Sequence, residues 1–150
     1  MIEVTASALA ALPFLRGMSP QHTKALSVAA TDVIFPAGCR IIEDGGYATK
    51  FWLVQSGRIA LDKHLPGRGT VTVETVGMGG LVGWSWLFPP HRWTFAAVAL
   101  TRVEAFQFDA SAVRERCAAD PELAYELTSR LAQVISRRLA ATQARLLDSG

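Results

Sequence analysis

Apolar residues recur with helical spacing in the first thirty positions of the chain. An apolar stripe runs from Ala25 to Ala30, after a Ser19-Pro20 pair that is typical of a helix cap followed by proline at the first helical position. A shorter helix is expected around Ala6 to Leu12. Residues 1–30 are therefore predicted to form N-terminal helices.

The pattern changes over residues 31–109 into short β-branched or aromatic runs separated by glycine-containing turns. Such runs favour β-strands, and seven or eight of them at this spacing indicate an antiparallel sandwich or barrel. The predicted strands are Asp32 to Phe35, Arg40 to Glu43, Lys50 to Gln55, Arg58 to Lys63, Thr70 to Val76, Trp93 to Ala99 and Arg102 to Asp109.

Helical spacing returns over residues 110–150. Ala110 to Ala119 is predicted to be a short helix that ends before Asp120, and Pro121 is expected to start a long one. The apolar stripe of the long helix is longer than one small barrel would cover, which predicts a homodimer or a partner protein that packs on this helix. The stripe consists of Leu123, Leu127, Leu131, Val134, Ile135, Leu139, Leu146 and Leu147, interrupted by the polar Thr142. Beside it, Arg130, Arg137, Arg138 and Arg145 are interpreted as a solvated flank that pairs with Glu122 and Glu126.

The composition is that of one soluble globular domain over residues 1–150. Half of the residues are apolar, 19% are charged and the formal net charge is +2, which argues against a disordered chain and gives no electrostatic reason to expect nucleic acid. The first apolar stretch is broken by Pro13, and no stretch approaches the roughly 20 apolar residues of a membrane-spanning helix. We therefore expect a cytoplasmic protein without membrane contact.

Cysteine and histidine are sparse and scattered. Cys39 and Cys117 are far apart and form no CxxC pair, and the three histidines lack ligand spacing. We expect no metal site, and we interpret both cysteines as small apolar residues in a reducing compartment.

The stretch Ile41 to Gly57 resembles the strand-turn-strand signature of cyclic-nucleotide-binding domains, as found in bacterial regulators of the catabolite-activator type. In that signature two apolar residues precede a glycine turn, here Gly45, and four apolar residues are followed by x-x-Gly, here ending at Gly57. Both glycines are expected at positive φ. Phe35 to Gly38 is similar to the family's turn into this region, and the resemblance extends from about Leu12 to Leu147.

This resemblance implies a mainly β fold with flanking helices (α+β). The expected architecture is a double-stranded β-helix, or jelly-roll β-roll, over residues 31–109. N-terminal helices over 1–30 precede it, and a hinge helix and a long C-terminal helix over 110–150 follow. In the family, a short helix presents amides to the cyclic phosphate, the Glu of a Phe-Gly-Glu motif accepts the ribose hydroxyl, and an Arg followed by a small hydroxyl residue binds the phosphate.

The corresponding segment of this chain departs from the family pattern. Gly83 is retained, but Trp84 is at the Glu position and Trp93 is at the Arg position, with Thr94 at the hydroxyl position. Arg92 is one residue out of register, which on a strand points a side chain to the opposite face. It could replace the missing Arg only if the loop Pro89 to His91 shifts the register. Because each charge-assisted hydrogen bond contributes about 1.5 to 3 kcal/mol, the loss of two predicts that cyclic AMP and cyclic GMP do not bind in the family's usual way.

The remaining candidate ligand-binding residues are Ser85 and Trp86, with Arg92, in the cassette, and Arg138 and Thr142 on the long helix. The closely spaced indoles leave three interpretations open. They could stack on a planar ligand, surround a cation, or fill the vacated cavity as part of the core.

Two main functions follow from the sequence. One is a non-catalytic regulatory or sensory module, in which a cyclic nucleotide or another small ligand in the modified cassette moves the hinge helix and the long helix. The other is an interaction module that has lost its ligand and dimerises. The sequence shows no helix-turn-helix after the long helix, so direct DNA binding is not expected unless the chain is a fragment of a longer protein. A metal-dependent enzyme on the same roll would need clustered histidines, whereas His64 and His91 stand alone.

Overall fold

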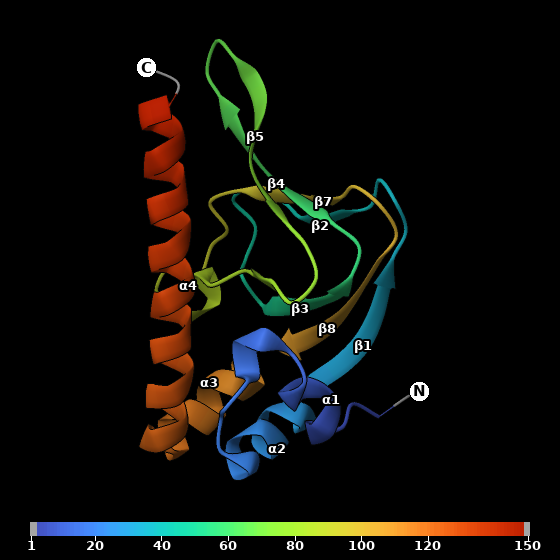
Figure 1. The fold of residues 1–150 in the computed structure, drawn as a ribbon, viewed down its shortest axis with the longest axis vertical. Coiled ribbons are helices and arrows are strands. Elements are labelled where there is room, and N and C mark those ends of the chain that lie inside the picture. Colours follow the sequence, from blue (N-terminus) through green and yellow to red (C-terminus); the bar gives the residue numbers. More distant parts are fainter. Residues whose placement is uncertain (1–2, 149–150) are drawn as a thin grey trace.

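The structure is a computed structural model, and it describes residues 3–148. Helices lie at both ends of the chain and eight strands lie between them (Figure 1). The elements are α1 (Ala6–Ala10), a 3-10 helix η1 (Pro13–Leu15), α2 (Pro20–Val28), β1 (Ala30–Phe35), β2 (Arg40–Ile42), β3 (Lys50–Ser56), β4 (Ile59–Leu65), β5 (Gly69–Val76), β6 (Leu81–Val82), a 3-10 helix η2 (Ser85–Leu87), β7 (Ala96–Ala99), β8 (Val103–Asp109), α3 (Ala110–Ala119) and α4 (Pro121–Asp148).

The strands form two antiparallel four-stranded sheets, in the orders β1-β8-β3-β6 and β2-β7-β4-β5. Their facing sides enclose the core, and α4 runs along one side of the resulting β-roll while α1, α2 and α3 gather at one end (Figure 1). The mainly β roll with flanking helices and a long C-terminal helix is therefore confirmed.

Two strand predictions need correction. The predicted strand Trp93 to Ala99 is too long, because β7 begins at Ala96. The backbone of Trp93 bonds to the turn before β3 instead: its N–H donates to Gly46 O at 2.8 Å and its carbonyl accepts from Gly45 N at 2.9 Å. The two-residue strand β6 was not predicted at all, because two residues are too short to show alternation.

The predicted positive φ angles of two turn glycines are confirmed, at 88° for Gly45 and 90° for Gly57. A Cβ atom at Gly57 would clash with the carbonyl oxygen of Arg102, so this position needs glycine for space as well as for φ.

The core of the roll is centred on stacked aromatic rings. Phe51 lies between Trp86 and Phe108, with ring centroids 4.4 Å and 4.7 Å away. All three rings are almost completely buried. Offset and stacked aromatic pairs of this kind add to the free energy gained by burial, so the segment that contains Trp86 is fixed to the core at this point.

The helix boundaries after the roll agree with the prediction. Asp109 caps α3 by accepting from Ala112 N at 3.1 Å, and Asp120 caps α4 by accepting from Glu122 N and Leu123 N at 3.1 Å and 3.3 Å. The apolar stripe of α4 divides into two parts. Leu123, Leu127, Leu131 and Val134 are buried, whereas Leu139, Leu146 and Leu147 are exposed.

The predicted side-chain cap at Ser19 is not formed. The Ser19 hydroxyl donates to Glu126 Oε1 on α4 at 2.7 Å instead of accepting from the α2 amides. Glu126 also contacts His22, with 3.1 Å between Oε1 and Nδ1. The start of α2 is thus attached to α4.

The arginines of α4 do not pair with Glu122 and Glu126 as expected. Arg130 donates to the carbonyl oxygens of Phe14 and Arg16, and Arg138 pairs with Glu74 on β5. The prediction fails because Glu126 is already bonded to Ser19 and because Arg138 faces the β-roll rather than solvent. Within residues 3–148, no helix combines the length and apolar character needed to cross a lipid bilayer.

Candidate functional site

The cassette segment connects the two sheets beside α4. After β6 the chain turns at Gly83, with φ 97°, forms the single turn η2, and returns through a loop to β7. A Cβ atom at Gly83 would lie 2.6 Å from the Trp93 ring, so a larger residue here would displace the indole. Gly83 therefore allows Trp93 to pack closely beneath the turn.

Two of the cassette indoles are part of the hydrophobic core. Trp86 is fully buried on Phe51, and its Nε1–H donates to Gly83 O at 3.2 Å. Trp93 is 5% exposed and packs against Trp52 and Phe95, with ring centroids 6.2 Å and 5.9 Å apart. The sequence left open whether the indoles bind a planar ligand, surround a cation or fill the core. Trp86 and Trp93 fill the core.

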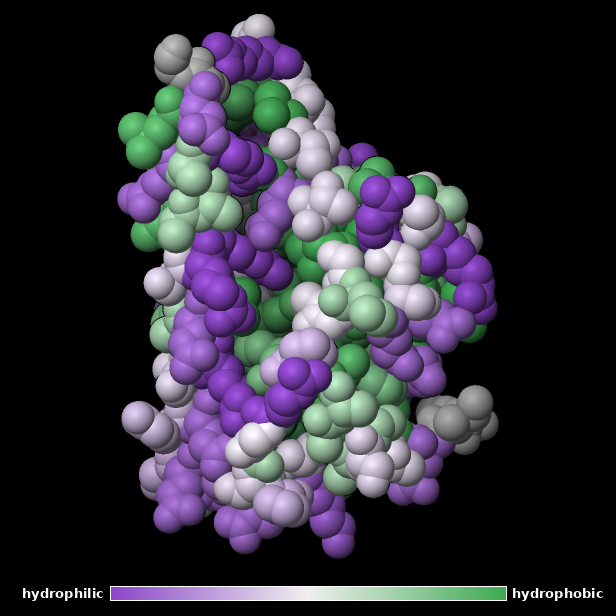
Figure 2. All heavy atoms as spheres, in the orientation of Figure 1, coloured by the Kyte–Doolittle hydropathy of each residue, from purple (hydrophilic) through white to green (hydrophobic). Residues whose placement is uncertain are grey.

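Trp84 has a different environment. Its half-buried ring lines a cavity of about 420 Å³ between the β-roll and α4, together with the predicted site residues Thr94, Arg138 and Thr142. The rest of the lining is mostly apolar and comprises Leu61, Lys63, Val73, Glu74, Phe95, Ile135 and Leu139. In Figure 2, apolar atoms occupy the hollow between the column formed by α4 and the roll.

The other predicted site residues lie outside this cavity. Gly83, Ser85, Trp86 and Trp93 are not among its lining residues. Arg92 is exposed and faces the turn before β3: its guanidinium donates to Gly45 O at 2.9 Å and to the Tyr47 hydroxyl at 2.8 Å. Its guanidinium carbon lies 4.1 Å from the centre of the Tyr47 ring. The structure thus brings four of the nine candidates together.

Arg138 connects α4 to three parts of the roll. Its Nε lies 3.1 Å from Glu74 Oε1, its Nη2 donates to Leu81 O, and its guanidinium carbon lies 5.1 Å from the centre of the Trp84 ring. Its Nη1 is buried and has no hydrogen-bond partner among the described residues. Burial lowers the pKa of Arg138; the Glu74 carboxylate opposes this shift, and the neighbouring charge of Arg137 adds to it.

A second cationic side chain at the cavity is already paired. Lys63 Nζ donates to Thr94 O at 2.6 Å and lies 3.3 Å from Asp44 Oδ2. Its charge is therefore balanced by a carboxylate outside the cavity lining.

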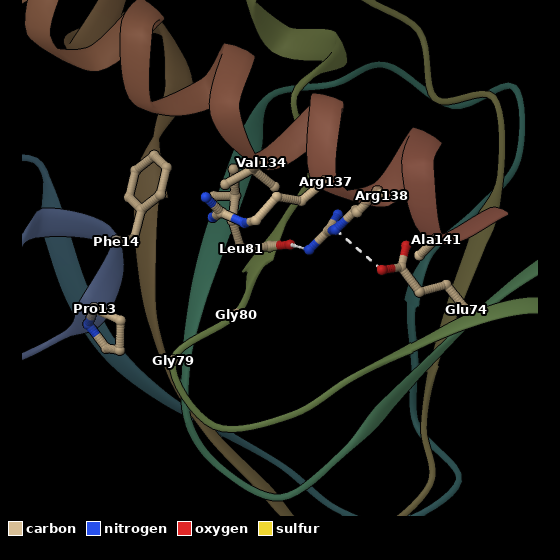
Figure 3. A pocket seen from close by; sticks show the side chains of 10 residues that line it. All are labelled: Pro13, Phe14, Glu74, Gly79, Gly80, Leu81, Val134, Arg137, Arg138 and Ala141. Atoms are coloured by element: carbon tan, nitrogen blue, oxygen red, sulfur yellow. Dashed lines mark hydrogen bonds and ion pairs between the residues drawn. The ribbon is translucent and has the colours of Figure 1, made fainter. Parts of the chain in front are cut away.

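A second cavity, of about 330 Å³, shares Arg138 and Glu74 with the first (Figure 3). It is bounded by η1, by the turn at Gly79 and Gly80, and by α4 residues that include Val134 and Arg137. Figure 3 shows Arg138 and Glu74 pointing toward one another beside it, so this ion pair contributes to the walls of both cavities.

Glu74 and Lys63 were not among the candidates from the sequence. Glu74 lies on β5, where its position in the sequence is typical of a surface residue. It is 64 positions before Arg138, and no local sequence pattern connects the two residues. In the part of the chain that the structure describes, no group of three or more His, Cys, Asp or Glu side chains is arranged to hold a metal ion.

Comparison with known proteins yields matches over most of the chain. Residues 32–120 match the sequence model of the family described as "Cyclic nucleotide-binding domain". A curated relative, the CRP-like cAMP-activated global transcriptional regulator of Mycobacterium tuberculosis, is 26% identical over 140 residues. The aligned region is 93% of this chain but 61% of that relative, so the chain spans less than two thirds of the relative's length.

Solved structures support the fold. A cyclic nucleotide-binding domain from Methylobacillus flagellatus has a TM-score of 0.83 at 19% identity, covering 99% of this chain and 83% of that chain. A putative cyclic nucleotide-binding protein from Geobacter metallireducens has a TM-score of 0.82 at 23% identity, covering 93% and 99%. At these identities the similarity establishes the architecture of two sheets and a long helix.

Proposed function

Because the chain belongs to the cyclic nucleotide-binding domain family, we propose that it is a non-catalytic regulatory module that senses a small molecule in the cavity beneath α4. The single observation that carries this proposal is the location of that cavity: its walls come from both the β-roll and the long helix. A ligand there contacts both parts at once. We place this activity in the cytoplasm.

The proposal also includes the loss of the family's usual contacts with a cyclic nucleotide. Trp84 offers no carboxylate to a ribose hydroxyl, and Trp93 supplies no guanidinium to a phosphate. The burial of Trp93 in the core supports this part, because a ligand cannot reach that side chain without unpacking the roll. Arg92, which is next in sequence, is bonded to Gly45 and Tyr47 instead.

The signal would leave the cavity through α4. Arg138 contacts β5, β6 and Trp84, so a ligand that changes these contacts favours a different packing of α4 on the roll. The hinge helix α3, which contacts both η2 and α4, would move with it.

Calorimetric titration with cyclic AMP and cyclic GMP tests the absence of the family's contacts. We expect no micromolar binding to the unmodified protein. Trp84→Glu returns an acceptor for the ribose hydroxyl and should raise the affinity for cyclic AMP by about tenfold, whereas Trp84→Gln removes the same ring without adding the charge. Micromolar binding of cyclic AMP to the unmodified protein would contradict the proposal.

A second function, dimerisation through α4, is favoured by the exposure of its distal apolar residues. Leu139 is 57% and Leu147 is 82% exposed, and a second copy of the chain would bury such a stripe. Light scattering after size-exclusion chromatography should report a dimer, and Leu147→Glu should convert it to a monomer. Val28→Glu is the control, since Val28 is also highly exposed, at 70%, but lies on α2.

A further inference from the structure

We propose that the ligand of the cavity beneath α4 is an apolar monoanion, such as an aromatic or aliphatic carboxylate, whose anionic group replaces Glu74 beside Arg138. This inference rests on the proposed function above, because it assigns a chemical class to the molecule that the cavity senses. It depends on three properties of the site: the walls, the balance of charge, and the way in which Arg138 is bonded.

The walls fit an apolar body. Leucine, isoleucine, valine, phenylalanine and tryptophan side chains surround most of the space, and hydroxyl groups come only from Thr94 and Thr142 among its lining residues. A volume of about 420 Å³ lies near the lower end of the roughly 300 to 1,000 Å³ typical of small-molecule sites. A ligand with many hydroxyl or amide groups would leave several of them without partners, at a cost in affinity.

The charge balance favours one negative charge on the ligand. Three charged residues line the cavity, and Lys63 is balanced from outside by Asp44. Among residues 3–148, Arg138 is balanced only by Glu74, whose side chain is 29% exposed and can turn toward solvent. An anion that takes its place keeps the guanidinium paired, whereas a cation would lie beside two positive groups.

The bonding of Arg138 leaves room for a better acceptor. Glu74 contacts the guanidinium through a single Nε–Oε1 approach of 3.1 Å, and Nη1 has no acceptor among the described residues. A guanidinium binds carboxylates best through two parallel N–H groups. In the place of Glu74, a bidentate ligand carboxylate can accept from Nε–H and from Nη2, which carries a second N–H besides the one donated to Leu81 O. It therefore supplies a hydrogen bond that the present pair lacks.

The same exchange would explain how the ligand acts on the long helix. Arg138 is the α4 residue whose bonds to Glu74 and Leu81 connect that helix to β5 and β6. An anion that displaces Glu74 removes the connection to β5 and replaces it with one through the ligand.

Calorimetry and thermal shift with matched pairs of compounds test the inference. The probes are 4-phenylbutyrate and octanoate, each compared with its neutral amide, and cyclic AMP. We expect both carboxylates to bind and to raise the melting temperature, with the amides about tenfold to a hundredfold weaker because they lack the charge-assisted hydrogen bonds.

Variants test whether Arg138 and Glu74 determine the affinity for carboxylates. Arg138→Gln should weaken carboxylate binding by about tenfold to a hundredfold. Arg137→Gln is the matched control, because Arg137 lines only the second cavity and its loss should weaken binding far less than the loss of Arg138. Glu74→Gln removes the competing carboxylate and should tighten binding severalfold, which keeps the inference testable if Arg138→Gln does not fold.

The outcomes separate this inference from the function on which it rests. Equal affinities for amide and carboxylate, no carboxylate binding, or unchanged carboxylate binding in a folded Arg138→Gln protein would overturn the anion assignment alone. Micromolar binding of cyclic AMP would overturn the proposed loss of the family's contacts.

Discussion

The imidazole of His22 on α2 lies between two carboxylates that belong to the start of α4. Its Nδ1 is 3.1 Å from Glu126 Oε1, and its Nε2 is 3.2 Å from Asp120 Oδ2. His22 is 2% exposed, and Asp120 also caps α4. One buried ring thus holds the N-terminal helices against the junction of α3 and α4.

Glu126 gives this cluster a pH dependence. Burial raises the pKa of the Glu126 carboxyl, but hydrogen bonds from Ser19 and His22 outweigh it and hold the pKa below its usual value. A carboxyl whose pKa is lowered by folding stabilises the protein above its unfolded pKa, about 4.3, and loses that contribution as the pH falls.

We therefore expect Glu126→Gln to lower the free energy of unfolding by about 1 to 2 kcal/mol at pH 7. The difference between the two proteins should shrink below about pH 4.3. Urea unfolding at pH 7, 5 and 4 measures it. Glu122→Gln serves as the control, because the Glu122 side chain is exposed and lies one turn before Glu126 in α4. This change should alter the free energy of unfolding by less than about 0.5 kcal/mol.

Gly57 and Gly38 form a matched pair of turn glycines. Both have positive φ, 90° and 86°, but only Gly57 faces backbone atoms of a neighbouring segment, whereas nothing lies within 4 Å of a Cβ at Gly38. Gly38→Ala should cost about 1 to 2 kcal/mol through φ alone, and Gly57→Ala should cost about 1 to 3 kcal/mol more through the clash with Arg102 O. Equal costs in urea unfolding would show that the close approach is unimportant.

Trp93→Arg and Trp84→Glu each restore a residue of the family pattern, and they should have unequal effects on the free energy of unfolding. Trp93→Arg places a charge in the core and removes a packed indole, so we expect a loss of at least about 3 kcal/mol of unfolding free energy. Trp84→Glu changes a half-buried cavity wall and should leave a folded protein. Circular dichroism during denaturant titration compares them, and a stable Trp93→Arg protein would contradict the burial described for Trp93.

Cys117 should react slowly with alkylating reagents. Burial, and secondly the nearby Asp120 carboxylate, raise the pKa of its thiol, and only the thiolate reacts. In a Cys39→Ser protein, iodoacetamide at pH 8 should therefore label Cys117 severalfold more slowly in the folded state than in guanidinium chloride. Mass spectrometry over time gives both rates, and similar rates would argue against the raised pKa.

The sequence predicts the fold well where local signals and burial coincide. Ala110–Ala119 and the start at Pro121 follow from capping residues and a proline, and Gly45 and Gly57 follow from turn geometry. The start of β7 could not be predicted in the same way. Trp93 is not part of β7 because its backbone hydrogen bonds go to Gly45 and Gly46, which are far away in the sequence.

The candidate site was less predictable for the same reason. Arg138 and Thr142 were placed correctly on the long helix, but the acidic partner of Arg138 comes from β5 and depends on how α4 packs. Trp84 and Trp86 are two residues apart and look alike in the sequence. The single turn η2 sends one to the cavity and the other into the core, and no local pattern distinguishes them.

The length of α4 has a mechanical consequence. Its 28 residues extend for about 40 Å at 1.5 Å per residue, and the buried contacts that hold it end near Val134. A bend of about 10° near Val134 would carry the far end, about 20 Å away, sideways by about 4 Å. If the proposed exchange of one partner of Arg138 bends α4 in this way, a small change in the cavity would become a larger displacement at the exposed end of the helix.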